Sequence, residues 1–199
     1  MNDMSDRTKR LTDIIAFLQS AERLKDTLRS GRTAQGRSES TAEHSWRLCL
    51  MIMAFERDLA GFDVARLLKL AVVHDLGEAI HGDTPATEQH LDPDRPDRER
   101  RDMAVLCALL PADMCSDLLE LWDDYAIARS PEARLVKGFD KLETMLQHLV
   151  GKNAHDFDYE FNLTYGAAYT NHHPLLRDIR AIVDGSTRDR VGARPSSRM

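Results

Sequence analysis

The sequence predicts an all-α protein. Apolar residues recur three and four positions apart in several long segments, which places them on one face of a helix. Helix-start signals agree: residues 40–43 form a capping box, and the Ser-Pro at 130–131 suits a cap and first residue. Strand-like alternation and repeats do not stand out. We expect one compact helical domain over residues 1–184 and a flexible tail rich in Ser, Arg, Gly and Pro over 185–199.

Composition and charge narrow the class of protein. The chain has 199 residues, a net charge of -6 and no basic stripe, so we expect no nucleic-acid partner. No apolar run approaches the roughly 20 residues that span a bilayer, so we expect no membrane partner. Cys49, Cys107 and Cys115 lack the spacing of metal ligands and are typical of reduced core thiols. The reduced cysteines and the lack of a membrane-spanning apolar run favour a cytoplasmic protein.

Two helices are expected in the first third of the chain. Residues 6–25 carry Leu and Ile at helical spacing and predict an amphipathic helix. Residues 27–41 are rich in Gly, Ser, Thr and Arg, which is typical of a loop. A second helix is expected over about 41–58. Its inward face is predicted to carry Trp46, Cys49, Leu50 and Met53.

A central helix is expected over about 64–80. Asp63 can cap it, and the segment is apolar almost all round after Lys69, which indicates a central position. Gly82 and Pro85 then end it, and residues 85–96 form an exposed loop. Further helices are expected over residues 98–110, 112–128, 131–150 and 174–183.

A polar pair interrupts the apolar run of the central helix. His74 and Asp75 are adjacent, and Glu78 lies one turn later over the same flank. Burying such groups without partners is costly, so their presence calls for a function or a partner. Imidazole and carboxylate together suit Zn²⁺, Mn²⁺, Fe²⁺ or Co²⁺. A buried His-Asp hydrogen bond without an ion is an equally good interpretation of these three residues alone.

Two further residues extend the pattern. His44 lies in the first turn of its expected helix, where a lone His is more often a surface or capping residue. Asp140 lies in a helix where Asp is usually exposed or paired with a cation. Each signal is weak by itself. In chain order, however, the set H…HD…D resembles the signature of the HD-domain metal-dependent phosphohydrolases.

The resemblance is closest to the 5′-deoxynucleotidase branch of that superfamily. It spans roughly residues 10–165 and implies a compact helical HD-domain fold with a metal site between central helices, in a protein that forms a homodimer. The segments that carry it are Ala-Glu-His-Ser at 42–45, Val-His-Asp-Leu-Gly-Glu at 73–78, Gly-Asp-Thr-Pro at 82–85, Glu-Leu-Trp-Asp-Asp-Tyr at 120–125 and Lys-Gly-Phe-Asp-Lys at 137–141.

The resemblance also implies roles for single residues. Glu78 would orient or deprotonate a water molecule, and Asp83 would contact the sugar hydroxyl or handle the leaving oxygen. A bound cation suits this chemistry because it lowers the pKa of its water and neutralises phosphoryl oxygens. The ion would be Mn²⁺, Co²⁺, Zn²⁺, Fe²⁺ or Mg²⁺. Its expected ligands are His44, His74, Asp75 and Asp140.

Substrate contacts are expected from Arg29, Arg32 and Thr84. Arg29 matches an arginine of the family, and a guanidinium offers phosphate a two-pronged fork. Arg32 stands where the family's common pattern has a Trp, which is associated with recognition of the 2′-deoxy sugar. The preference between ribose and deoxyribose therefore stays open at this point.

The resemblance implies removal of the 5′-phosphate from (deoxy)nucleoside monophosphates. A second interpretation is an HD phosphohydrolase that acts on another nucleotide or a nucleotide pyrophosphate. A third is a non-catalytic module that binds metal and nucleotide, although neither Glu78 nor Asp83 is needed to hold a metal. A purely structural helical protein is the remaining alternative.

Overall fold

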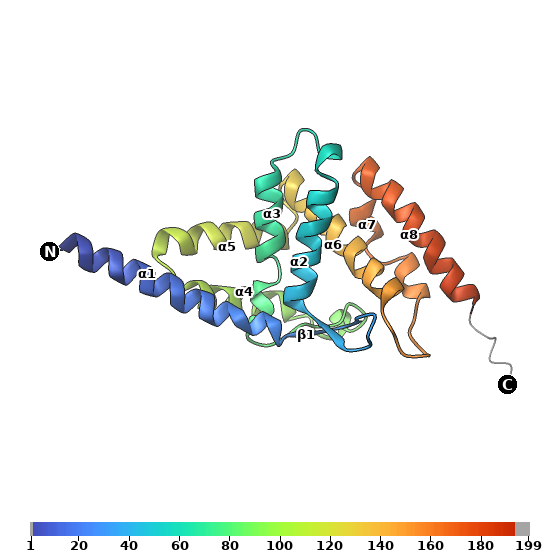
Figure 1. The fold of residues 1–199 in the computed structure, drawn as a ribbon, viewed down its shortest axis with the longest axis horizontal. Helices are drawn as coiled ribbons and strands as arrows, with labels where there is room; N and C mark the ends of the chain where they lie inside the picture. The colour runs from blue at the N-terminus through green and yellow to red at the C-terminus, as the bar shows by residue number, and fades with distance from the viewer. Residues whose placement is uncertain (1, 194–199) are drawn as a thin grey trace.

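A computed structural model describes residues 2–193 and shows a predominantly helical molecule (Figure 1). The helical fold class is confirmed, with a small hairpin added to it. The α-helices are α1 (Asn2–Ala21), α2 (Thr41–Ala54), α3 (Val64–Val73), α4 (Arg95–Cys107), α5 (Ala112–Ala126), α6 (Pro131–Val150), α7 (Ala167–Thr170) and α8 (Pro174–Gly192). Short 3-10 helices are η1 (Glu22–Lys25), η2 (Glu56–Asp58), η3 (Leu76–Ala79), η4 (Gln89–Leu91) and η5 (Glu160–Leu163).

The hairpin lies where the sequence predicts a loop. Strands β1 (Leu28–Arg32) and β2 (Ser38–Ser40) pair antiparallel, with Leu28 opposite Ser40 and Arg32 opposite Ser38. Neither strand has the alternation of apolar residues that would reveal it in the sequence. The hairpin packs against α6, where the Gln147 side-chain amide donates a hydrogen bond to the Arg32 carbonyl.

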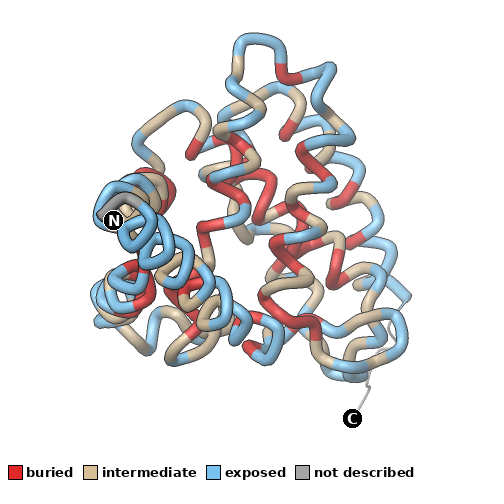
Figure 2. The backbone as a smooth tube through the Cα atoms, turned by 60° about the vertical axis from the view of Figure 1, so that its left-hand side comes forward, coloured by how far each residue is buried: buried red, intermediate tan, exposed pale blue. Residues whose placement is uncertain are grey.

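Helix α6 is at the centre of the larger core. Its buried residues Phe139 and Leu142 pack with Leu48 of α2, Leu67 of α3 and Leu176 of α8. A second core joins α1, α4 and α5 to η3 and includes Phe17 and Met103. Figure 2 shows buried backbone concentrated in the inner helices, whereas much of α1 is exposed along its length. The polar site described below lies where these inner elements meet.

The inward face predicted for α2 is wrong. Trp46, Leu50 and Met53 are 65%, 49% and 56% exposed, and Cys49 is only partly buried. The buried side chains of α2 are instead Thr41, His44, Ser45, Leu48, Met51 and Ile52. The helix carries apolar residues on two faces, and periodicity alone cannot decide which one packs inward. The face that carries His44 is buried because it joins the polar site.

The central helix is shorter than predicted. Helix α3 ends at Val73, and the chain continues as the 3-10 turn η3 instead of an α-helix to residue 80. Asp75, with φ -104° and ψ 10°, leaves the helical path, and its carbonyl accepts a hydrogen bond from the Glu78 amide. The tighter turn brings Gly77 against α4, where an added Cβ would lie 2.7 Å from the Glu99 carbonyl oxygen.

The last helix is longer than predicted. Helix α8 continues to Gly192, so residues 185–192 are helical rather than part of a tail. Thr187 is fully buried and donates to the Val183 carbonyl, and Arg190 donates to the Leu149 carbonyl of α6. These contacts sustain a helix whose composition resembles that of a disordered segment. The remainder of the expected tail, residues 194–199, lies outside the described residues. Among residues 2–193, no helix has the length and apolarity needed to cross a membrane.

We expect Gly138→Ala to destabilise the fold. An added Cβ would overlap Leu176 Cδ1 and lie 3.2 Å from the Tyr169 carbonyl oxygen. Overpacking of this kind costs about 1–3 kcal/mol. Gly185→Ala is the matched control, because Gly185 is helical and nothing lies within 4 Å of the added methyl group. The control should gain about 0.5–1 kcal/mol from helix propensity. Urea unfolding of both variants measures the difference, and equal stabilities would contradict the packing described here.

Candidate metal and phosphate site

A cavity of about 410 Å³ opens between the hairpin, η3, the loop after it, α4 and α6. Seven of the nine predicted site residues line it, among them Arg29, His74, Asp75, Glu78 and Asp140. Asp83 and Thr84 also line it. His44 lies directly behind this wall, with its Nε2 atom 3.1 Å from Asp140 Oδ1. The structure therefore brings together all four predicted metal ligands, although they come from three different helical elements.

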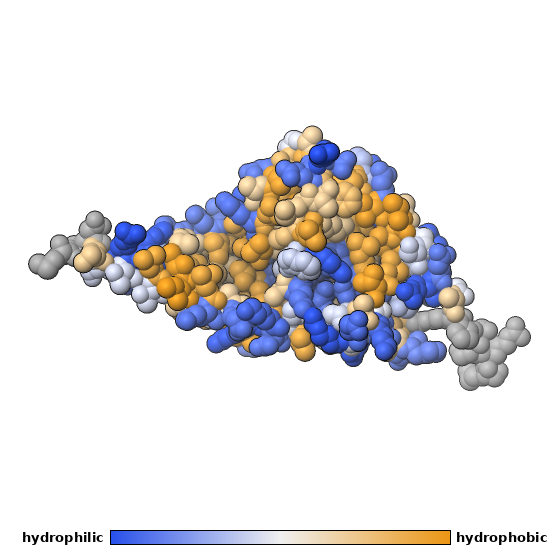
Figure 3. All heavy atoms as spheres, viewed as in Figure 1, coloured by the Kyte–Doolittle hydropathy of each residue, from blue (hydrophilic) through white to orange (hydrophobic). Residues whose placement is uncertain are grey.

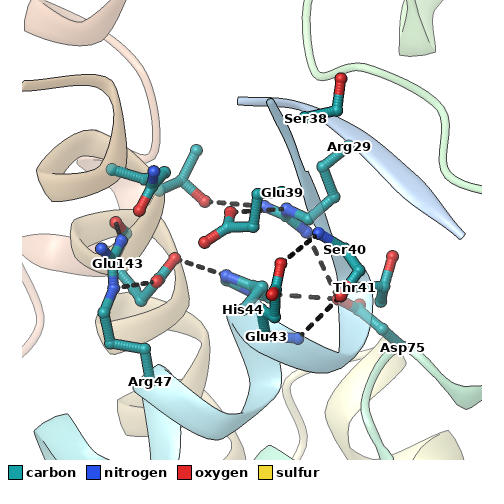
Figure 4. A network of polar contacts seen from close by, with 12 residues as sticks. Arg29, Ser38, Glu39, Ser40, Thr41, Glu43, His44, Arg47, Asp75 and Glu143 are labelled. Carbon is teal, nitrogen blue, oxygen red and sulfur yellow. Dashed lines mark hydrogen bonds and ion pairs between the residues drawn. The ribbon is translucent and has the colours of Figure 1, made fainter. Parts of the chain in front are cut away.

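His44 is held at the start of α2. Ser40 and Glu43 form the reciprocal capping box that the sequence predicts, which fixes the first turn of the helix. The fully buried imidazole pairs through Nδ1 with the carboxylate of Glu143, as Figure 4 shows. Arg47 donates to the other Glu143 oxygen at 2.6 Å and to its carbonyl at 3.2 Å. With Nδ1 directed at Glu143, Nε2 is the ring nitrogen that faces the site.

His74 has a comparable arrangement at the end of α3. Its Nδ1 lies 2.9 Å from the Ala71 carbonyl, to which it donates, so Nε2 again carries the free lone pair. The Nε2 atoms of His44 and His74 are both buried and have no hydrogen-bond partner in the described part of the chain. Buried nitrogens left in this state are costly unless something else binds them. His44, His74 and Asp75 each offer a ligand atom, and these atoms lie within 4.8 Å of one another.

The carboxylates complete a donor set suited to a divalent ion. Asp75 Oδ2 lies 3.0 Å from His74 Nε2 and 3.8 Å from His44 Nε2. Asp140 uses Oδ2 to accept hydrogen bonds from the Tyr125 hydroxyl and Lys141, at 2.7 and 2.8 Å, which leaves Oδ1 facing His44. Two imidazoles and two carboxylates are typical ligands of first-row divalent metals. The residues present therefore fit such an ion.

A second group of possible ligands, Glu39, His44 and Glu143, does not make a separate site. The Glu143 carboxylate is already shared by His44 and Arg47, and Glu39 lies 3.6 Å from the Arg29 guanidinium. Glu143, held by Arg47, orients His44 through Nδ1, while Nε2 faces Asp140. Carboxylate support of this kind commonly fixes the tautomer of a metal-binding histidine.

Glu78 and Asp83 lie close to this donor set without belonging to it. Glu78 is buried and accepts a hydrogen bond of 3.3 Å from the Thr41 hydroxyl. Burial, together with the neighbouring Asp75 and Asp83 carboxylates, raises the pKa of Glu78 to about 10. Burial also raises the pKa of Asp83 above its usual range. Acidic groups thus crowd one wall of the cavity, a repulsion that a cation would relieve.

Arg29 places a fixed positive charge among these carboxylates. Its guanidinium donates to the Thr144 hydroxyl at 3.0 Å and lies 3.5 Å from Asp75 Oδ2. Only 13% of its side chain is exposed. The other two predicted substrate contacts differ from each other. Thr84 lines the cavity, but Arg32 is exposed and donates to the Gly36 carbonyl.

The strand explains where the structure places Arg32. Side chains alternate across a strand, so Arg29 and Gly31 face inward while Leu28 and Arg32 face outward. Arg32 follows Arg29 by three residues, an odd number, so its side chain lies on the opposite face of the strand from that of Arg29. The sequence prediction missed this because it treated residues 27–41 as a loop. Arg32 is thus not brought to the cavity.

Several supporting residues were also missed by sequence reasoning. Glu143 pairs with His44, Tyr125 and Lys141 donate to Asp140, and Arg47 donates to Glu143. A helical pattern could have revealed Glu143, because it lies one turn after Asp140 on the buried face of α6. Arg47 similarly follows His44 by three residues. Tyr125 lies on another helix, and nothing in its sequence spacing predicts its contact with Asp140.

Comparisons with known proteins agree with this geometry. A family model described as "HD domain" matches residues 21–180. The chain is similar to the 5′-deoxynucleotidase HDDC2 of Homo sapiens, at 35% identity over 67% of this chain and 66% of the human protein. It is also similar to the 5′-deoxynucleotidase hdd1 of Schizosaccharomyces pombe, at 29% identity over 82% of this chain and 85% of that protein.

A solved structure has the same fold. It is described as a predicted metal-dependent phosphohydrolase from Magnetospirillum magnetotacticum MS-1. The TM-score is 0.76 at 27% identity, and the match covers 90% of this chain and 94% of the other. The chain belongs to the HD domain family. The resemblance identified from the H…HD…D pattern is confirmed, including its closeness to proteins named 5′-deoxynucleotidases.

The raised pKa of Glu78 predicts a pH-dependent stability for the metal-free protein. A glutamate in the unfolded chain releases its proton near pH 4.5, whereas folded Glu78 keeps it up to about pH 10. Between these values the folded state binds the extra proton, so stability falls as pH rises. Glu78→Gln removes this dependence, and the variant should gain stability relative to the native protein between pH 5.5 and pH 8.5.

Urea unfolding in the presence of a chelator measures this effect at both pH values. The exposed Glu88 offers the control Glu88→Gln, whose difference from the native protein should not change with pH. A constant stability difference for Glu78→Gln across the same range would contradict the described environment of Glu78.

Proposed function

We propose that the protein is a metal-dependent phosphomonoesterase that removes the 5′-phosphate from (deoxy)nucleoside monophosphates. The observation that carries the proposal is the pair of buried, unpartnered Nε2 atoms of His44 and His74, with Asp75 and Asp140 oxygens beside them. The names of the human and fission yeast relatives support the choice of substrate. The HD domain family and the phosphohydrolase fold support a divalent ion.

In this proposal His44, His74, Asp75 and Asp140 hold one ion. The paired imidazoles favour Mn²⁺, Fe²⁺, Co²⁺ or Zn²⁺ over Mg²⁺, which prefers all-oxygen sites. When bound, the ion supplies an acidified water molecule as nucleophile and neutralises charge on the phosphoryl oxygens. Glu143 with Arg47, and Tyr125 with Lys141, keep His44 and Asp140 in position for it.

The residues around the ion have separate tasks. Arg29 binds the phosphate, because its guanidinium is fixed by Thr144 and projects into a wall otherwise crowded with carboxylates. Glu78 takes the proton of the attacking water, since it lies beside the proposed ligands and a bound cation would lower its raised pKa and leave it ionised as a base. Asp83 and Thr84 lie on the loop that follows, where they contact the sugar or the leaving 5′-oxygen.

We expect phosphate release from nucleoside 5′-monophosphates when Mn²⁺ or Co²⁺ is supplied. The assay compares ribo- and deoxyribonucleotides of each base, with Mg²⁺ and a chelator as further conditions. Release of pyrophosphate from nucleoside triphosphates would instead favour an HD phosphohydrolase of another class. Saturable nucleotide binding without turnover, in metal-loaded protein, would favour a binding module.

Substitution of a proposed ligand should distinguish loss of metal binding from loss of activity that has another cause, such as misfolding. Asp75→Asn should lower metal content and reduce hydrolysis by more than about a hundredfold, because a charged ligand is lost. Glu78→Gln should retain the metal while losing most activity. Asp123→Asn is the control, since the Asp123 side chain pairs with Arg100 on the surface and does not line the cavity. Elemental analysis of the purified variants measures metal content, and a native metal content in Asp75→Asn would rule out its role as a ligand.

We also propose that the protein works in the cytoplasm as a homodimer. Its three cysteines are unpaired, which suits a reducing compartment. For the dimer, the support is an apolar stripe on α2 formed by Trp46, Leu50 and Met53, beside the 55% exposed Val72 of α3. Figure 3 shows apolar surface on this side of the molecule over α2 and α3. Contiguous exposed apolar surface is typical of an interface.

Leu50→Glu should convert the dimer to a monomer. Association would bury the new carboxylate of each protomer in an apolar interface, and burying an unpaired charge costs free energy. Sedimentation or light scattering at micromolar concentration measures the mass. Leu91→Glu is the control, since Leu91 is 72% exposed in η4, away from this stripe. A monomeric native protein, or a Leu50→Glu variant that remains dimeric, would contradict the proposal.

A further inference from the structure

The cavity extends beyond the groups that the proposed hydrolysis uses. Its far end is lined by residues of α6 and of the segment between α6 and α7. These residues are Gln147, His148, Phe157, Asp158, Phe161 and Tyr165. None of them touches the proposed metal ligands through a described hydrogen bond. The aromatic side chains are only partly buried, so their rings are available to a ligand in the cavity.

Helix α6 runs from the metal end of the cavity to its aromatic end. Asp140, Thr144 and His148 follow one another at intervals of four residues and therefore share a face of the helix. Asp140 belongs to the metal end, Thr144 accepts from the Arg29 guanidinium, and His148 begins the aromatic end. At 1.5 Å per residue, the eight-residue separation is about 12 Å.

Strand β1 of the hairpin runs along the cavity in the same direction, from the metal end to the aromatic end. Arg29 lies near Asp75, and Gly31, two residues along β1, lies against the aromatic end. A Cβ on Gly31 would lie 3.9 Å from His148 Cδ2 and 3.4 Å from Gln147 Cγ. A ligand whose phosphate is bound by Arg29 would thus extend past Gly31 toward His148.

The aromatic end is suited to a flat, uncharged heterocycle. Phe157 packs edge-on against His148, with ring centroids 4.8 Å apart, and Phe161 stacks on Tyr165 at 5.2 Å. Burial lowers the pKa of His148, which keeps its ring neutral. His148 Nδ1 pairs with Asn162 Oδ1 at 3.0 Å, and Nε2 has no hydrogen-bond partner among residues 2–193. Asp158 adds a negative charge that disfavours a second phosphate here.

Resting on the proposed nucleotidase function, we infer that the aromatic end is the nucleobase subsite, where the base stacks on Phe157 and Phe161 and directs a polar edge to His148. Stacking on aromatic side chains accepts every base, because each base has a π face. The free Nε2 of His148 accepts a hydrogen bond from a base N–H, which all four common bases possess. The subsite therefore selects nucleotides over other sugar phosphates without strong selection among bases.

The test compares a deoxynucleoside 5′-monophosphate with 2-deoxyribose 5-phosphate, which lacks the base. Phe157→Leu should lower the ratio of their kcat/KM values about tenfold, through a higher KM for the nucleotide. Phe157→Tyr restores a stacking ring and should restore the ratio. Phe62→Leu is the matched control, because Phe62 also packs edge-on against a histidine, His173, but lies outside the cavity lining.

The outcomes separate this inference from the function on which it rests. Native protein that releases phosphate from no nucleotide would overturn the proposed function itself. Native protein that hydrolyses nucleotides, with an unchanged substrate ratio in Phe157→Leu, would overturn the nucleobase subsite alone. If Phe157→Leu does not fold, Phe161→Leu carries the same comparison, and an unchanged ratio there would equally overturn the subsite.

Discussion

The structure depends on two buried histidine nitrogens, the Nε2 atoms of His44 and His74, that have no hydrogen-bond partner among residues 2–193. Each imidazole is fixed through its other nitrogen, His44 by Glu143 and His74 by the Ala71 carbonyl. Leaving both Nε2 atoms unpaired costs free energy unless a bound species compensates for it. The hairpin, the broken end of α3 and the face of α6 all bring further charged groups to this point. Packing alone does not explain such an arrangement.

The broken end of α3 shows how local structure serves the site. In a continuous helix, adjacent residues such as His74 and Asp75 would diverge by about 100° around the axis. The change to a 3-10 turn after Val73 lets Asp75 Oδ2 approach His74 Nε2 to 3.0 Å and directs Glu78 into the cavity. An interrupted helix is expected at a functional site, where the positions of the side chains matter more than the helix propensity of the sequence.

Sequence reasoning predicted the helical class and several helix starts, because caps and apolar spacing are local signals. It failed where the outcome depends on tertiary contacts. Helix α2 has two apolar faces, and only the burial of His44 decides that Leu48 rather than Leu50 packs inward. Arg32 was expected at the substrate, but the pairing of two short polar strands turns it outward. The four proposed ligands were found through their order in the chain, whereas the supporting contact of Tyr125 with Asp140 required the fold.

The position of the proposed ligands along the chain has a consequence for the life of the protein in a cell. His44 lies in α2, His74 directly follows α3 and Asp140 lies in α6, so an ion bound by them would act as a cross-link between segments nearly 100 residues apart. A ligand at a hundred times its dissociation constant stabilises the folded state by about 2.7 kcal/mol. The amount of folded enzyme would then follow the concentration of free metal. When metal is scarce, more of the protein would unfold and be degraded, and this loss would lower the activity in addition to the loss of the bound ion itself.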